Sequence, residues 1–141
     1  MQPYLFLDVD GVLNTYHSLV EGDDLHSPCV EQLRRILKEA DPEVVLSSTW
    51  RNYPDLRRKV WKVVGHRGKC TPKIGGVWRG GEIDLFLKKD PRPYVILDDD
   101  NDMLPEQMPN LIQTDPTVGL TEERADKVIE LLKTLQKLQE C

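Results

Sequence analysis

Short apolar runs alternate along the chain with stretches that carry apolar residues at helical spacing. Four runs have the length and composition of buried strands, at residues 4–8, 44–47, 94–98 and 111–114. Four segments show a helical pattern, beginning at Ser27, Pro54, residue 82 and Thr121. Ser27 and Thr121 are predicted to cap their helices, and the glycine-rich residues 65–81 to be mostly loop. This alternation predicts a three-layer α/β sandwich around a mostly parallel sheet.

The first and third of these apolar runs end in clustered acids. The first ends in Asp8 and Asp10, followed by Gly11, and the third ends in Asp98 and Asp99. Asp-Gly is also a common turn signal, so a solvated turn is the alternative interpretation. If the two strands are parallel neighbours, however, the acids share one small volume at the edge where open α/β sheets bind ligands. Such crowding raises the pKa of each acid unless a cation neutralises it, and an all-oxygen site that also binds phosphate suits Mg²⁺.

Three segments carry a resemblance to a known superfamily. Residues 8–13 (DVDGVL) resemble motif I of the haloacid dehalogenase (HAD) phosphohydrolases, residues 44–49 (VVLSST) motif II and residues 97–99 (LDD) motif IV, in the same order along the chain. Four further segments resemble the small HAD domains of Swiss-army-knife RNA repair proteins, at residues 48–51, 79–83, 97–100 and 114–121. The resemblance implies a Rossmann-like α/β/α sandwich and a phosphatase activity.

The resemblance also implies roles for the acids. Asp8 is the expected nucleophile, which forms an aspartyl-phosphate, and Asp10 is the expected general acid and base. In the family, the metal is held by the first acid of motif I, the backbone carbonyl of the second and an acid of motif IV. We expect Asp99 to supply that last ligand, with Asp98 as the next candidate and Asp102 as a supporting residue.

The phosphate-binding residues are expected around motifs II and III. Ser48 is the candidate hydroxyl donor of motif II, beside the backbone N–H of Thr49, and Ser47 takes that role if the alignment slips by one. Ser47, Thr49 and Arg51 are the predicted substrate-binding residues. Arg79 is predicted as the motif III cation, although many HAD enzymes have lysine there; the other candidates are Lys73, Lys88 and Lys89.

A basic run follows motif II in an otherwise acidic chain of net charge −5. The run comprises Arg51, Arg57, Arg58, Lys59, Lys62, Arg67, Lys69 and Lys73. The net charge argues against a broadly basic nucleic-acid surface, and a solvated helix face is one interpretation of the run. A landing surface for a polyanionic substrate is the other. The nearby aromatic residues either stack on bases or pack internally: Trp50, Tyr53, Trp61 and Trp78.

Size and composition set the remaining expectations. The 141 residues are expected to form a single HAD-like domain, because the chain is long enough for one core. Cys29, Cys70 and Cys141 are too few and too widely spaced for a disulfide framework or a zinc site, which favours a reducing cytoplasm. No apolar stretch has the length of a membrane span, and Asp8 interrupts the first run too early for a signal peptide.

The spacing of the motifs leaves little room for a cap domain. Residues 14–27 are long enough only for a flap, and residues 51–78 hold one helix and a loop. An open site favours large substrates, so we expect a Mg²⁺-dependent phosphatase acting on nucleic-acid ends such as 3′-phosphates. A small-metabolite or nucleotide phosphatase is one alternative, and a non-catalytic HAD-like binding module is another. The presence of both motif I acids argues against the second alternative.

Overall fold

Five strands form one sheet in which every hydrogen-bonded pair of strands runs parallel. The computed structural model describes residues 1–140. The strands are β1 (Tyr4–Leu7), β2 (Glu43–Leu46), β3 (Lys69–Cys70), β4 (Tyr94–Asp98) and β5 (Leu111–Gln113), in the spatial order β3-β2-β1-β4-β5. In the register, Leu7 of β1 lies beside Leu46 of β2 and Leu97 of β4. The order places β1 at the centre of the sheet, with the first and third predicted strands as neighbours.

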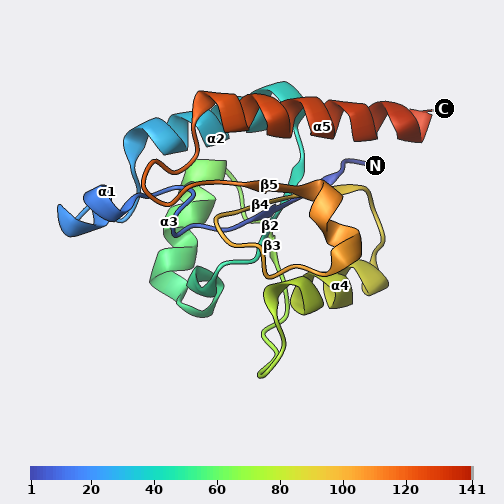
Figure 1. The fold of residues 1–141 in the computed structure, drawn as a ribbon, viewed down its shortest axis with the longest axis horizontal. Coiled ribbons are helices and arrows are strands. Elements are labelled where there is room, and N and C mark those ends of the chain that lie inside the picture. Colours follow the sequence, from blue (N-terminus) through green and yellow to red (C-terminus); the bar gives the residue numbers. More distant parts are fainter. Residues whose placement is uncertain (141) are drawn as a thin grey trace.

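Helices cover both faces of this sheet (Figure 1). One face carries α2 (Ser27–Ala40), α3 (Pro54–Val64) and α5 (Glu122–Glu140), whereas the other carries α4 (Arg79–Lys89) and the 3₁₀ helix η2 (Pro105–Asn110). Alternate residues of β1 enter the two cores, Leu5 and Leu7 toward α2 and α5, Tyr4 and Phe6 toward α4. The predicted three-layer, Rossmann-like α/β/α sandwich is therefore confirmed.

Local sequence signals explain several of the helix ends. Pro54 is the first residue of α3, and Gly65, with a φ of 94°, ends that helix in the left-handed region. Thr121 accepts a hydrogen bond from the backbone N–H of Arg124 at 3.3 Å, as expected of a cap. The prediction for Ser27 was wrong by one position, because Ser27 is the first residue of α2 and His26 flanks it without a side-chain cap bond.

Two parts of the chain that were predicted as irregular contain secondary structure. Residues 65–81 include β3, an edge strand of only two residues, and the start of α4 at Arg79, three residues before the predicted start. The predicted flap contains the short helix α1 (Tyr16–Val20), which begins with a reciprocal hydrogen-bond pair between Thr15 and Ser18. Neither β3 nor α1 is long enough to produce a periodic pattern of apolar residues in the sequence.

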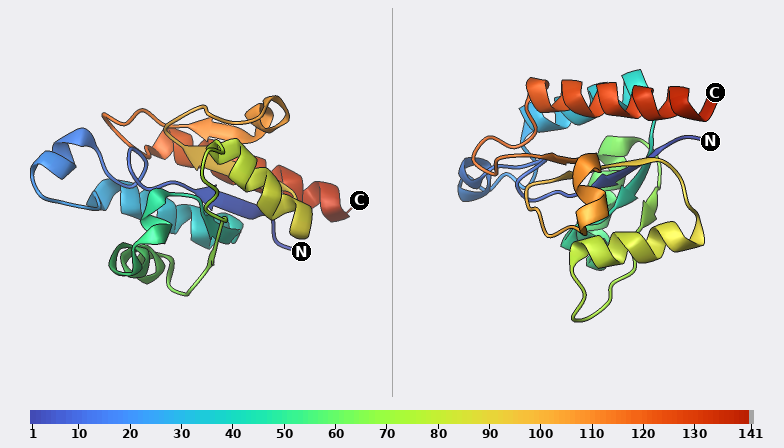
Figure 2. Two further views of the ribbon diagram at one scale, coloured as in Figure 1. Left: turned by 90° about the horizontal axis from the view of Figure 1, so that it is seen from below. Right: turned by 45° about the vertical axis from the view of Figure 1, so that its right-hand side comes forward.

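The connections at the carboxyl edge of the sheet are short. In Figure 2, α1 projects at the end of the molecule opposite the two termini. Between β2 and β3 lie only the 3₁₀ helix η1 (Thr49–Asn52) and α3. Within residues 1–140, these short connections leave the carboxyl edge without a separate covering domain.

No helix within residues 1–140 has the length and apolar character that crossing a membrane requires.

Candidate active site

The polar residues that follow the strands form a row across the carboxyl edge of the sheet. Asp8, Ser47 and Thr71 each extend the sheet ladder by one residue, since each donates its backbone N–H to the neighbouring strand at 3.0 Å. Asp98 holds the same register position at the end of β4. Because strand side chains alternate, all four point toward the layer that contains α4. The central position of this row is Asp8.

Three carboxylates meet around this central position. One oxygen from each of Asp8, Asp98 and Asp99 lies within 4.8 Å of the others, and Asp98 is completely buried. Gly11 allows this approach, because its φ is 80° and a Cβ there would lie 2.3 Å from Oδ2 of Asp99. The hydroxyl of Thr114 donates to the carbonyl of Gly11 at 2.7 Å and fixes the turn. The turn after β1 is thus shaped around the acid of the neighbouring strand.

Arg79 contacts two of these acids at once. It is the first residue of α4, whose N-terminus opens toward the carboxyl edge, and its Nη1 lies 3.0 Å from Asp8 Oδ1 and 2.7 Å from Asp98 Oδ2. Burial works against its charge, but the attraction of Asp8 and Asp98 outweighs burial and raises the pKa of Arg79. One guanidinium therefore faces three carboxylates, which leaves an excess of negative charge.

Burial and the excess of negative charge raise the pKa values of several acids in this site. The pKa of Asp8 is raised well above its ordinary value, first by burial and then by repulsion from Asp98, despite the opposing effect of Arg79. Burial also raises the pKa of Asp99 and of Asp102. A hard divalent cation fits this cluster, because all donors are oxygens and a cation removes the repulsion. Asp99 has no arginine partner among the described residues, so it is more available as a ligand than Asp98.

Asp10 lies outside the carboxylate cluster. Its Oδ1 accepts hydrogen bonds from Asn14 Nδ2 at 2.9 Å and from the indole N–H of Trp50 at 3.2 Å, while the residue stays exposed to solvent. Asn14 also accepts the backbone N–H of Gly11 at 3.0 Å, so it links the carboxylate to the turn. Asn14 was not among the predicted site residues. Of the two interpretations of Trp50, base stacking or internal packing, burial supports internal packing, because Trp50 is only 6% exposed. Only the arrangement of the turn shows that these two residues orient Asp10.

The two motif II serines differ in what their hydroxyls do. Ser48 accepts the backbone N–H of Trp50 at 3.1 Å and caps η1. The hydroxyl of Ser47 is completely buried and has no hydrogen-bond partner within residues 1–140, and the same holds for the hydroxyl of Thr71. Ser47 shares the register position of Asp8, and its hydroxyl is free. This favours Ser47 over Ser48 as the residue whose hydroxyl donates a hydrogen bond to phosphate. Thr49 follows as an exposed residue at the start of η1.

Arg51 is a buried clamp between three segments. Its side chain is 5% exposed and donates to the carbonyls of Ser47 at 3.1 Å, Ser48 at 2.8 Å and Thr71 at 3.2 Å. Its remaining N–H groups reach Glu82 of α4 at 2.8 Å. These bonds join the motif II turn to the helix that carries Arg79. The donors of Arg51 are thus engaged with protein, and its expected contact with substrate stays a prediction.

Within residues 1–140, the other basic candidates for motif III make no ion pair with the three clustered acids. Lys88 pairs with Asp84 at 3.2 Å, and Lys73 and Lys89 are exposed. In the described part of the chain, Arg79 is the basic side chain in ion-pair contact with the cluster.

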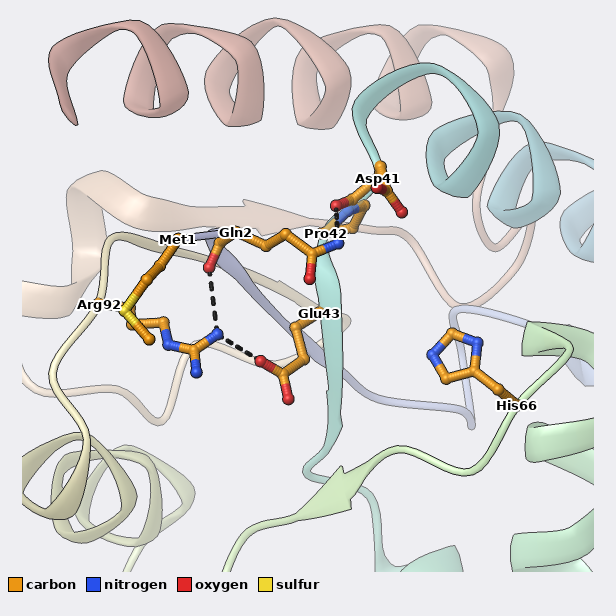
Figure 3. A pocket seen from close by; sticks show the side chains of 7 residues that line it. All are labelled: Met1, Gln2, Asp41, Pro42, Glu43, His66 and Arg92. Atoms are coloured by element: carbon orange, nitrogen blue, oxygen red, sulfur yellow. Dashed lines mark hydrogen bonds and ion pairs between the residues drawn. The ribbon is translucent and has the colours of Figure 1, made fainter. Parts of the chain in front are cut away.

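A charged pocket lies at the opposite, amino end of the sheet (Figure 3). Arg92 is its central cation, paired with Glu43 and hydrogen-bonded to the backbone carbonyl of Gln2 at 3.4 Å. The pocket volume is about 400 Å³. Its cation is already paired with an acid of the same pocket, whereas the acids at the carboxyl edge outnumber their cation.

The fold and the carboxyl-edge acids define a Rossmann-like α/β domain of the HAD superfamily. The family model described as "HAD domain in Swiss Army Knife RNA repair proteins" matches residues 4–125, and the chain belongs to this family. Searches of curated proteins and of solved structures gave no significant match. Membership of the family suggests a phosphatase-type activity.

Proposed function

We propose that this protein is a Mg²⁺-dependent phosphomonoesterase that works through an aspartyl-phosphate at Asp8. The observation that carries the proposal is the contact of Arg79 with Asp8 and Asp98, beside Asp99, at the centre of the carboxyl edge. This places a buried carboxylate next to a fixed cation and a set of oxygen ligands. A core interaction would balance these charges instead of leaving an acidic excess.

In the first step, a carboxylate oxygen of Asp8 attacks phosphorus and the bond to the leaving oxygen breaks. Asp10, in its protonated form, gives its proton to that oxygen, so an alcohol leaves. In the second step, the Asp10 carboxylate removes a proton from water, whose oxygen attacks phosphorus. The acyl-phosphate bond then breaks, which releases inorganic phosphate and restores Asp8. The hydrogen bonds from Asn14 and Trp50 support this role, because they orient Asp10 beside the cluster.

Three further groups are proposed to hold the transferred phosphoryl group. The Ser47 hydroxyl and the backbone N–H of Thr49 donate to its oxygens, and Arg79 stabilises the charge that develops in the transition state. Asp8, Asp99, the backbone carbonyl of Asp10 and, as the weaker candidate, Asp98 would hold Mg²⁺. When bound, the ion would neutralise phosphate charge and reduce the repulsion between Asp8 and its acidic neighbours.

We propose nucleic-acid ends, with 3′-phosphates preferred, as the substrate class for this single domain. The short connections around the carboxyl edge support a large substrate, because the substrate itself then excludes water from the site. The family description, which refers to RNA repair proteins, supports the same choice.

The test is phosphate release from an aryl phosphate and from 3′- and 5′-phosphorylated oligonucleotides, with and without Mg²⁺. We expect Mg²⁺-dependent release, with the 3′-phosphorylated oligonucleotide as the best substrate. Asp8→Asn should reduce turnover by roughly 10⁴-fold or more, as loss of a nucleophile does in other covalent enzymes. Asp55→Asn is the matched control, since Asp55 is 87% exposed on α3. Acid quenching of labelled substrate should trap phosphate on Asp8, and normal turnover by the Asp8→Asn variant would overturn the covalent mechanism.

A further inference from the structure

A groove outside the acidic site follows the free edge of the sheet along β3. Two adjoining pockets share Cys70 and Phe86, and they lie between α3 on one side and α4 on the other. Their volumes are about 410 and 380 Å³, within the range of roughly 300–1,000 Å³ that small-ligand clefts occupy. The groove is therefore large enough for groups of nucleotide size.

The charged residues that line this groove are all basic. They are Arg57, Arg67, Lys69 and Lys89. Lys69 is partly neutralised by Glu43 at 3.2 Å, whereas Arg67 and Lys89 are exposed and have no acidic partner in residues 1–140. Other members of the basic run are paired outside the groove, Arg58 with Asp55 and Lys59 with Asp24. Three members of the run therefore line the groove of an otherwise acidic protein, namely Arg57, Arg67 and Lys69.

The two halves of the groove differ in character. The half beside α3 carries three of the basic residues together with Trp61, and the half beside α4 is lined by Pro72, Ile74, Leu85 and Phe86. A single nucleic-acid strand has the same two parts, with charged phosphates on one side and apolar base faces on the other. A β-strand peptide fits less well, because β3 offers an edge of only two residues for pairing.

The groove also leads toward the acidic site. Its Pro72 end follows Thr71, which lies in the same row as Asp8 and two strands away from it. Adjacent strands are about 4.8 Å apart, so this separation is only about 10 Å. The loop that continues from Ile74 ends at Arg79. A strand with its terminal phosphate at Asp8 can therefore extend into the groove.

We propose that this groove binds the nucleotides next to the scissile phosphate of a single-stranded nucleic acid; this inference rests on the proposed function. Phosphates lie against the basic half, and a base packs on the apolar half. The groove then supplies the substrate contacts that a cap domain supplies in other enzymes.

The test measures binding separately from turnover. In the Asp8→Asn background, fluorescence anisotropy measures the affinity for a 3′-phosphorylated single-stranded oligonucleotide across a range of salt concentrations. We expect Arg67→Glu combined with Lys89→Glu to weaken binding by at least about 10-fold and to lower the salt slope by about 2. Lys133→Glu on α5 is the control for surface charge and should change affinity less than twofold.

A second readout separates this proposal from the proposed function. With Asp8 intact, the groove variants should hydrolyse the aryl phosphate at the normal rate but show a raised KM for the oligonucleotide. Equal affinities of the groove and Lys133→Glu variants would overturn the groove, as would equally strong competition by an acidic peptide. If the groove variants lose binding but the intact protein releases no phosphate, the proposal that the groove binds nucleic acid is supported. The proposed phosphatase activity is then refuted. Thermal unfolding of each variant excludes misfolding as the cause.

Discussion

The two ends of the sheet each hold one arginine among acids, but only one end is balanced in charge. At the amino end, Arg92 pairs with Glu43 and with Asp90, and Lys69 pairs with Glu43 as well. Two cations thus face two carboxylates, and the ring of Tyr4 packs 4.5 Å from the Arg92 guanidinium. The charges of this network balance without any further ion.

At the carboxyl end, Arg79 alone faces Asp8, Asp98 and Asp99. Burial and repulsion from Asp98 raise the pKa of Asp8, and the attraction of Arg79 offsets this only in part. The difference teaches that an arginine–acid network indicates chemistry only where the charges remain unbalanced after all protein partners are counted. If this is right, substitutions at the carboxyl end should change activity and substitutions at the amino end should change only stability.

After the loss of Asp8, the largest expected effect concerns the carboxyl end. Arg79→Ala should lower kcat by about 10²–10³-fold, because it removes the cation that we propose to stabilise the charge of the transition state. Steady-state kinetics with the aryl phosphate measures the change, and Lys73→Ala is the control from the loop before α4. If Lys73→Ala reduces kcat far more than Arg79→Ala, then Arg79 is not the motif III cation.

The second expected effect is stabilisation by the metal. Mg²⁺ at 100 times its Kd should raise the free energy of unfolding by about 2.7 kcal/mol, which corresponds to a Tm rise of about 5–10 °C for a protein of this size. Asp99→Asn should remove most of this rise, because it deletes a proposed ligand. Glu43→Gln, the matched change at the amino end, should leave the rise intact. An equal loss in both variants would show that the stabilisation is not specific to the carboxyl end.

These contrasts also show how far the sequence determined the site. Asp8, Asp98 and Asp99 were predictable, because each follows an apolar run and parallel neighbours bring such ends together. The contact of Arg79 with Asp8 was expected only from a family resemblance. The register row instead favours Ser47 over Ser48, since hydrogen-bond partners decide which hydroxyl stays free.

Other features depend on contacts that no local pattern encodes. The fold class followed from alternating apolar runs, but β3 has two residues and carries no periodicity. Arg51 gave a basic signal typical of a surface, yet it is buried, and Glu82 from a distant helix together with four backbone carbonyls accepts its donors. Long-range pairing of this kind appears only in the folded chain.

The third expected effect belongs to the balanced end. Arg92→Met should lower the free energy of unfolding by about 1–3 kcal/mol, because Glu43 loses a partly buried partner. Turnover of the aryl phosphate should stay within twofold of the original value. Chemical denaturation and steady-state kinetics measure the two quantities. A large fall in kcat at unchanged stability would refute the division between a structural and a reactive end.

The smallest expected effect is the alkaline sensitivity of Tyr4. Burial, together with its hydrogen bond to Asp90, raises the pKa of Tyr4 to about 12. The unfolded chain ionises near pH 10, so this contribution is complete below pH 10 and is lost as the pH rises toward 12. Tyr4→Phe keeps the ring packed against Phe86, at 5.3 Å between centroids, and should cost only about 1 kcal/mol at pH 7.

Thermal unfolding between pH 8 and 12 distinguishes the two proteins, since the original chain should lose stability more steeply above pH 10 than the Tyr4→Phe variant. Burial raises the pKa of Tyr94 as well, but that residue is common to both proteins and cancels in the comparison. Parallel curves would mean that the Tyr4 hydroxyl is not held by the Arg92 network. The amino end would then lack the closed set of partners that distinguishes it from the acids around Asp8.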